Sequence, residues 1–296
     1  PAHPVRAAAT TARKVTAMKL CSATAALLLC LTSTPWQGAY AQEKKPLWEL
    51  GLGAFAMQLP AYRGSEESLN TVLPIPYIIY RGEFLKADRN GVRGVFFESD
   101  KVEINLSFAA SPPVNNGEVA VREGMPGLTA SLELGPSLDI KLWHSPRKDI
   151  QLRLFLPARA AFTLESNPRF IGWQVGPRLN LDIEQPLGLQ GWTLGSVAGP
   201  LFGSHAQHAY FYGVAPAYST PTRPSYEAKG GYAGVQVLSA LWKRFPGFWV
   251  GGFVRYDNLH GAVFEDSPLV TQKSRLAGGL AIAWVLGKSS QMVNVE

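Results

Sequence analysis

Two histidines come closest to the spacing of a metal site in this chain. His205 and His208 are three residues apart, so on a helical turn their imidazoles would share one face. No carboxylate follows them at the spacing that zinc hydrolases use. We therefore interpret both as exposed loop histidines and expect no metal and no cofactor.

Residues for nucleophilic or acid–base chemistry are present but not in a recognisable pattern. Ser204 precedes His205, yet catalytic triads are assembled in space rather than by adjacency, and the chain has no G-x-S-x-G motif. Asp257, His260 and Asp266 would suit an enzyme at the outer rim of a membrane barrel. Solvated loop residues are the simpler interpretation, so we expect the chain not to be an enzyme.

The charged residues that alternate with apolar ones are more informative. If they face the interior of a barrel, their mixed signs favour mutual pairing, because buried charges need partners. A narrow hydrated pore that uses the charges for selectivity is the functional alternative. The candidate lumen-lining residues are Glu133, Arg153, Arg159, Arg178, Asp182 and Arg255.

The strand pattern is clearest between Leu128 and Leu164. Leucine, isoleucine and alanine occupy alternate positions over residues 128–142, and again over residues 150–164 after a short polar turn. Period-2 alternation gives a strand one apolar and one polar face. Each run exceeds the roughly 9–11 residues that a tilted strand needs to cross a membrane. We expect the leucines to contact lipid and the charges to face the lumen.

Twelve such runs follow one another, and they predict an all-β fold: an antiparallel transmembrane β-barrel of about 12 strands. The predicted strands are residues 48–58, 70–80, 83–88, 92–98, 101–110, 128–142, 150–164, 170–184, 192–204, 231–242, 248–257 and 274–286. Alternation does not say which face is inside. A soluble sandwich or lipocalin-like barrel with an aliphatic interior is the alternative fold.

The connections differ in length in a regular way. Residues 59–69, 111–127, 205–230 and 258–273 are long loops, and the turns at the opposite strand ends are short. Outer-membrane barrels have long extracellular loops and short periplasmic turns. The short turns therefore offer candidate periplasmic contacts, at His144, Arg147, Lys148 and Gln185.

Tryptophan and proline positions add two expectations. Six tryptophans near strand ends on the short-turn side predict a girdle at the membrane interface: Trp48, Trp143, Trp192, Trp242, Trp249 and Trp284. Pro136, Pro177 and Pro200 each follow a glycine inside a predicted strand. Proline cannot donate to a β-ladder, so we expect bulges or bends there. The alternative is that these runs are each two shorter strands.

The first 41 residues have the layout of a secretory signal peptide and an upstream segment. Arg13, Lys14 and Lys19 precede an apolar stretch, and Ala39 and Ala41 frame a small-residue cleavage site. Residues 42–296 then form a single barrel domain. Removing residues 1–41 lowers the basic residues from 28 to 24 against 22 acidic ones, so the net charge of +6 comes largely from this segment. We find no phosphate-binding loop and no nucleic-acid-binding face.

Several short motifs resemble one family. Residues 51–64 (GLGAFAMQLPAYRG), 74–81, 210–226 and 256–269 (YDNLHGAVFEDSPL) are similar to the MltA-interacting protein (MipA)/OmpV family of Gram-negative outer-membrane proteins. The resemblance extends over most of residues 46–286. It implies a barrel in the cell envelope, and a scaffold that links a lytic transglycosylase to a penicillin-binding peptidoglycan synthase. The sequence departs at its end, where twelve residues follow Trp284 instead of a terminal aromatic.

Three hypotheses of function follow. The first is a non-enzymatic outer-membrane scaffold in peptidoglycan biosynthesis, in contact with membrane lipid and cell-wall enzymes. The second is a porin-like channel for small solutes. The third, an enzyme at the outer rim, depends on His205, His208 and His260.

Overall fold

A computed structural model describes residues 43–88 and 91–295 of the chain. Residues Lys44–Val293 form one compact unit, and this unit contains the barrel. The predicted signal peptide, residues 1–41, lies outside the described residues.

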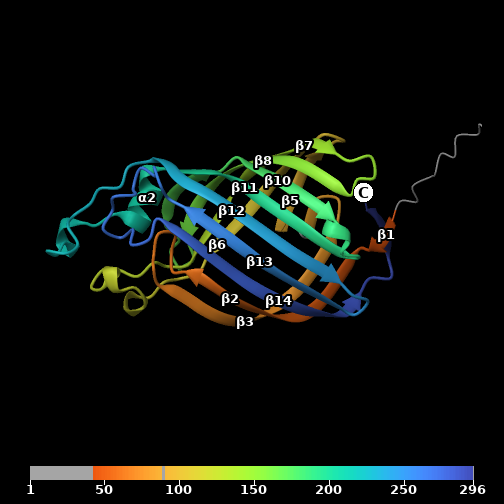
Figure 1. Cartoon of the computed structure of the whole chain (residues 1–296), viewed down its shortest axis with the longest axis horizontal. Coiled ribbons are helices and arrows are strands. Elements are labelled where there is room, and N and C mark those ends of the chain that lie inside the picture. The colour runs from red at the N-terminus through yellow and green to blue at the C-terminus, as the bar shows by residue number, and fades with distance from the viewer. Residues whose placement is uncertain (1–42, 89–90, 296) are drawn as a thin grey trace, which may run out of the picture. The chain divides into compact units, whose positions relative to one another are not determined.

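The described elements are mostly long strands (Figure 1). The strands are β1 (Glu43–Pro46), β2 (Trp48–Pro60), β3 (Ser68–Arg81), β4 (Leu85–Asp88), β5 (Gly91–Glu98), β6 (Val102–Ser111), β7 (Ser131–His144), β8 (Ile150–Thr163), β9 (Phe170–Val175), β10 (Arg178–Glu184), β11 (Trp192–Gly203), β12 (Gly231–Arg244), β13 (Phe248–Asn258), β14 (Ser274–Lys288) and β15 (Met292–Val295). The helices are η1 (Asn116–Glu118), η2 (Ala120–Arg122), η3 (Pro186–Gly188), α2 (His205–Tyr212) and η4 (Pro216–Tyr218).

Strands β2 to β14 form one closed antiparallel barrel. Each strand pairs with the next in sequence except β9 and β10, which do not pair with each other, and β14 pairs with β2 to close the ring. β9 and β10 occupy a single position, because both pair with β8 on one side and with β11 on the other. The barrel therefore has twelve strand positions, as the alternation predicted.

The three Gly-Pro pairs behave differently from one another. At Pro177 the ladder is interrupted between β9 and β10. The register with β8 is the same before and after the interruption, since Gln174 pairs with Arg159 and Arg178 pairs with Phe155. At Pro200 the register with β12 shifts, which is the expected bulge. At Pro136 β7 continues without a shift, so the bulge predicted there is wrong; the shift in β7 lies between Lys141 and Trp143 instead.

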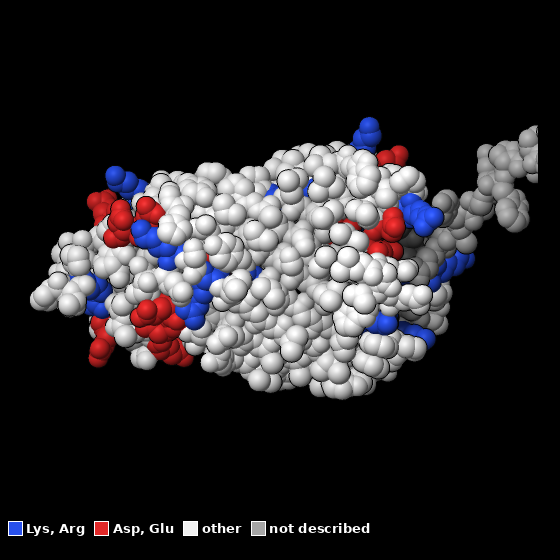
Figure 2. Space-filling view, in the orientation of Figure 1, with Lys and Arg blue, Asp and Glu red and all other residues white. Residues whose placement is uncertain are grey.

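The polar face of the strands lies inside the barrel. Glu133, Asp139 and Arg153 are buried, whereas outward positions such as Leu280 and Val72 are 72% and 73% exposed. On the face drawn in Figure 2, charged side chains gather toward the two ends of the barrel and leave its middle largely free of charge. A broad apolar belt on a closed barrel is the surface of an outer-membrane type of barrel. The alternative fold with an aliphatic interior is wrong.

The packed hydrophobic core lies in the long connections rather than in the strands. Val119, Tyr212, Leu259, Phe264 and Leu269 come from three different connections and are almost completely buried. We call this packed set of connections the cap. It includes α2, where the sequence predicted only loop. None of the helices in the described residues is long and apolar enough to cross a membrane.

The predicted tryptophan girdle is only partly present. Trp143 and Trp284 lie outward, 55% and 49% exposed. Trp242, in contrast, approaches Gly195 beside the carboxylate of Asp182, so it faces the lumen. Trp249 faces inward, in the same register as Phe253 and Asp257, so the prediction that it belongs to the girdle is also wrong. Rings near strand ends can face either way, and only the register distinguishes them.

Candidate functional site

The lumen holds the charged residues that the alternation singled out. Glu133, Arg153 and Asp182 are buried, with 8%, 8% and 6% of their surface exposed. Arg159, Arg178 and Arg255 are half-buried on the same inward registers. All six line the interior, but they fall into separate clusters.

The first cluster lies between β7, β8 and β10. The Arg153 guanidinium donates to Asp139 at 3.2 Å and to Asp182 at 2.9 Å. The amide of Asn180 also donates to Asp182, at 2.8 Å. These residues are held on adjacent strands, so the guanidinium bridges two carboxylates that would otherwise repel each other.

A second cluster lies at the short-turn end of the lumen and was not predicted. Glu49 of β2 is 2% exposed and accepts from Arg81 at 2.8 Å. Arg244 of β12 also pairs with Glu49, and it donates to the Tyr77 hydroxyl at 2.7 Å. The signal was available, because Glu49 is the one charged residue in the alternating run of β2.

A third cluster joins the cap to the lumen. Asp257 of β13 accepts from Arg255 at 2.8 Å and from Arg63 at 2.9 Å. Gln236 of β12 donates to the same carboxylate at 2.9 Å. Arg63 belongs to the loop of residues 61–67, and its backbone carbonyl accepts from the Tyr212 hydroxyl at 2.9 Å. Sequence reasoning missed Arg63, because a loop residue has no alternation to show which way it faces.

The three histidines in the long loops differ in burial. His208 is 2% exposed inside the cap, where its ring packs edge-on against Phe264 at 4.6 Å between centroids. His205 is exposed on the same helix, and His260 is exposed in the next long loop. The interpretation of His208 as an exposed loop residue is therefore wrong. Among the described residues, no group of His, Cys, Asp and Glu is arranged to hold a metal ion.

The environment of His208 fixes its tautomer and lowers its pKa. Its Nδ1 lies 2.6 Å from the backbone carbonyl of Lys229, which can only accept, so Nδ1 carries the proton. Nε2 is buried and has no hydrogen-bond partner. Burial lowers the pKa of His208 below its ordinary value, and the nearby Arg63 charge lowers this pKa further. The ring is therefore neutral in the folded cap at neutral pH.

The acids and histidine considered for a rim enzyme do not come together. Asp257 is inside the lumen and bound to two arginines. His260 is exposed, and Asp266 lies at the surface 3.9 Å from Lys273. The structure therefore assembles no acid–base pair from these three residues.

The candidate contact turns form one surface at the short-turn end. The turn of residues 145–149 and the turn of residues 185–191 are neighbours, because the Glu184 amide donates to the Asp149 carbonyl at 2.7 Å. We call residues 144–149 and 184–191 the turn surface. The predicted residues His144, Arg147, Lys148 and Gln185 are all exposed on it.

Two leucines give the turn surface an apolar character that sequence reasoning did not single out. Leu187 is fully exposed, at 101%, and Leu189 is 46% exposed. Lys148, Gln185 and Leu187 also have positive φ angles of 58°, 53° and 53°. A left-handed backbone costs an L-residue about 1 kcal/mol or more. Strained turns with exposed apolar tips are a common feature of contact sites.

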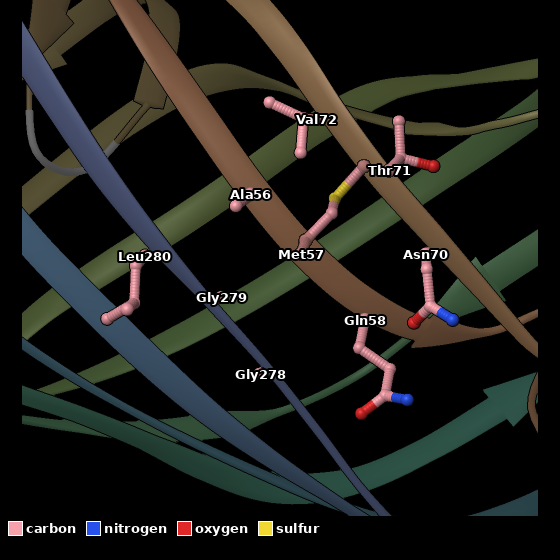
Figure 3. A pocket seen from close by; sticks show the side chains of 9 residues that line it. All are labelled: Ala56, Met57, Gln58, Asn70, Thr71, Val72, Gly278, Gly279 and Leu280. Carbon is pink, nitrogen blue, oxygen red and sulfur yellow. The ribbon is translucent and has the colours of Figure 1, made fainter.

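The barrel wall also has a shallow depression (Figure 3). It lies where Gly278 and Gly279 of β14 thin the wall next to β2 and β3. Its side chains include Ala56, Val72 and Leu280, and none of its nine lining residues is charged. It is suited to apolar contact and not to acid–base chemistry.

Comparison with known proteins gives one clear match. A family model described as MltA-interacting protein MipA matches residues 50–286, which is most of the chain. No curated protein matches the sequence significantly.

Two solved structures are similar in outline. One is titled "Bacterial polysaccharide outer membrane secretin", with 6% identity, a TM-score of 0.40 and coverage of 82% of this chain and 99% of that chain. The other is the P. putida toluene transporter TodX, with 11% identity, a TM-score of 0.30 and coverage of 86% and 70%. Likeness at this level carries no information about function.

Proposed function

This chain belongs to the MipA family, and from that membership we propose that it is a non-enzymatic scaffold of the Gram-negative outer membrane. In this proposal the chain is exported, its apolar belt contacts lipid, and its short turns face the periplasm. It docks a lytic transglycosylase, as the family description implies, and brings a penicillin-binding peptidoglycan synthase to it. A fold does not establish a function, so the proposal depends on the surfaces of the molecule.

The turn surface is the observation that carries the proposal. It combines the exposed cations Arg147 and Lys148 with the fully exposed Leu187. Protein interfaces typically have an apolar centre and a polar rim, and this surface offers both on a rigid barrel end. It fits a partner with an apolar pocket bordered by carboxylates.

The cap supports a structural role for the barrel. Arg223 holds two long connections together, donating to the carbonyls of Val121 and Glu123 at 2.8 Å and to that of Tyr218. Tyr62 ties a third connection to a fourth through the Leu269 carbonyl at 2.7 Å. Packed connections at one end oppose free diffusion through the lumen.

A pull-down with the purified transglycosylase tests the proposal. The detergent-solubilised barrel should retain the enzyme, and Leu187→Asp or Lys148→Glu should weaken retention about tenfold, the loss of roughly 1.4 kcal/mol that a central contact often carries. Lys229→Glu is the matched control, since Lys229 is an exposed lysine at the opposite end. Equal retention by all variants would show that the turn surface is not the docking site. Failure of the unaltered barrel to retain the enzyme would reject the scaffold.

A small-solute channel is the second candidate, because part of the lumen is open. Leu73 faces inward, as shown by its pairing with Phe55, whose ring meets Phe253 at 5.9 Å, and yet Leu73 is 42% exposed. Planar-bilayer recording separates the two candidates. Discrete conductance steps that change in Arg159→Gln would favour the channel, and a silent bilayer would favour the scaffold.

A further inference from the structure

Three arginines lie near one another just below the cap, and two of them, Arg159 and Arg178, also lie near the carboxylate of Glu133. Arg159 comes from β8, Arg178 from β10 and Arg63 from the loop of residues 61–67. The charges that act on Arg178 are those of Arg159, Glu133 and Arg63. Leu201 of the cap core approaches Gly176, which in turn lies beside the Arg178 Nε, so this group is at the boundary between cap and lumen.

The charges of this cluster are not balanced. Arg63 and Arg255 share the one carboxylate of Asp257. Arg159 and Arg178 have only Glu133 nearby, and neither forms a salt bridge with any described residue. Counting all six side chains, four cations face two anions. In the Arg153 and Glu49 clusters, by comparison, every arginine is in a direct ion pair.

Hydrogen-bond donors in the cluster are also left over. The Arg178 Nε and the Arg63 Nη2 are buried and have no acceptor among the described residues. The Arg159 Nε donates to the Ser107 hydroxyl at 3.0 Å, and its guanidinium forms no other hydrogen bond with the described residues. Buried donors without partners are costly and rare in folded proteins. Two of them beside a third guanidinium indicate a place for an acceptor with several oxygens.

We propose that Arg63, Arg159 and Arg178 form a binding site for a small oxyanion, a phosphate or carboxylate group of a solute that enters the lumen. The planar guanidinium matches both groups in geometry, and charge-assisted hydrogen bonds to such anions are among the strongest in proteins. Glu133 lowers the affinity of the site for an anion. It is 8% exposed and lies near two of the arginines, so its negative charge opposes the anion.

Part of the lumen is open to solvent, because the inward-facing Leu73 of β3 retains 42% exposure. In this proposal the solute approaches from the short-turn end, because the packed cap covers the other end of the lumen and forms the floor of the site. This inference does not require the scaffold function.

Calorimetric titration of the full barrel in detergent tests the site. The probes are inorganic phosphate and, separately, citrate, in a buffer free of other oxyanions. We expect saturable binding of at least one probe, and the stronger of the two identifies the class of group. Arg178→Gln should raise the dissociation constant about tenfold, because it removes a charge-assisted hydrogen bond to the anion.

The Glu133→Gln variant makes the test decisive, because it should tighten binding while Arg178→Gln weakens it. Arg169→Gln removes an exposed arginine outside the lumen and should leave binding unchanged. Heat-modifiable mobility on gels checks that each barrel is folded. Absence of binding to the unaltered barrel, an equal loss in Arg169→Gln, or weaker binding in Glu133→Gln would each overturn the proposal.

Discussion

At the scale of single residues, the same side chain has a different role depending on whether its partner is in place. Arg153 is ion-paired with two carboxylates, whereas Arg178 has none in direct contact. Buried ion pairs contribute little net stability, but an unpaired buried charge is expensive. Substitutions at Arg153 and at Arg178 are therefore expected to affect the stability of the barrel differently.

Replacing Arg153 by Leu should destabilise the barrel strongly. The change leaves Asp139 and Asp182 buried without their shared cation, and breaking a buried pair on one side typically costs about 3–5 kcal/mol. Urea unfolding in detergent, followed by tryptophan fluorescence, measures the free energy of unfolding. Arg169→Leu breaks a largely exposed pair and should change the free energy of unfolding far less. Similar losses in the two variants would contradict the buried cluster.

Acidification should loosen the cap through His208. The pKa of this ring is lowered in the folded cap, so the unfolded cap binds the proton more readily. The contribution of the neutral His208 ring to the stability of the cap is complete above the ordinary pKa of about 6.5. This contribution declines as the pH falls below that value, and the decline ends only below the pKa of His208 in the folded cap.

Hydrogen exchange of residues 205–230 between pH 8 and pH 5 measures this effect. The protection factor, which is the intrinsic exchange rate divided by the observed rate, should fall at the acidic end in the unaltered barrel. It should depend less on pH in His208→Gln, which removes the titrating ring. His205→Gln removes an exposed histidine of the same helix and should behave like the unaltered barrel. Identical pH profiles for all three would exclude His208 as the cause.

At the scale of elements, close approach of strands decides which positions tolerate a side chain. A Cβ at Gly199 of β11 would lie 2.1 Å from the Pro177 carbonyl, at the point where β9 gives way to β10. Pro177, which has no amide proton to donate, and Gly199 therefore belong to one feature, a bend at which β11 closely approaches the junction of β9 and β10. The sequence showed both residues but not their contact, since they come from different strands.

Gly199→Ala should weaken the barrel at this bend. The methyl group collides with backbone, which cannot rotate away, and overpacking of this kind costs about 1–3 kcal/mol. Urea midpoints and heat-modifiable mobility measure the loss. Gly247→Ala, in a turn with no atom within 4 Å of the added carbon, should leave both unchanged. A neutral Gly199→Ala would mean that β10 and β11 are further apart.

At the scale of the whole molecule, the barrel is the inverse of a soluble domain. Its middle is apolar outside and charged inside, and its packed apolar core is confined to the cap. This arrangement is stable only when lipid covers the belt, because such an extent of exposed apolar surface would otherwise drive association. The charges toward the ends mark where the belt stops (Figure 2).

Leu280→Arg tests the lipid contact of the belt. Leu280 lies outward in the middle of β14, and an arginine facing lipid near the bilayer centre costs about 2–4 kcal/mol. Unfolding in lipid vesicles measures this cost. Leu187→Arg makes the same replacement at the fully exposed turn and should be neutral for stability. Equal stability of the two variants would place Leu280 in water.

The sequence by itself determined the barrel, because alternation is a local property of each strand. The twelve runs, the length of Leu128–Leu142 and the polarity of residues such as Glu133 and Arg153 required only the pleat of a strand and the cost of burying charge. It also identified the family through motifs in order. It could not separate Trp242 inside from Trp284 outside without the register.

Only the tertiary structure decided how residues from distant elements meet. His208 entered the cap core because Phe264 and Tyr212 surround it, and Arg63 reached the lumen from a loop without any periodic pattern. Whether Arg153 or Arg178 is neutralised depends on carboxylates of other strands, not on its own neighbours in sequence. A direct ion pair forms only when the two charged groups lie within about 4 Å of each other, so its formation is set by the folded geometry.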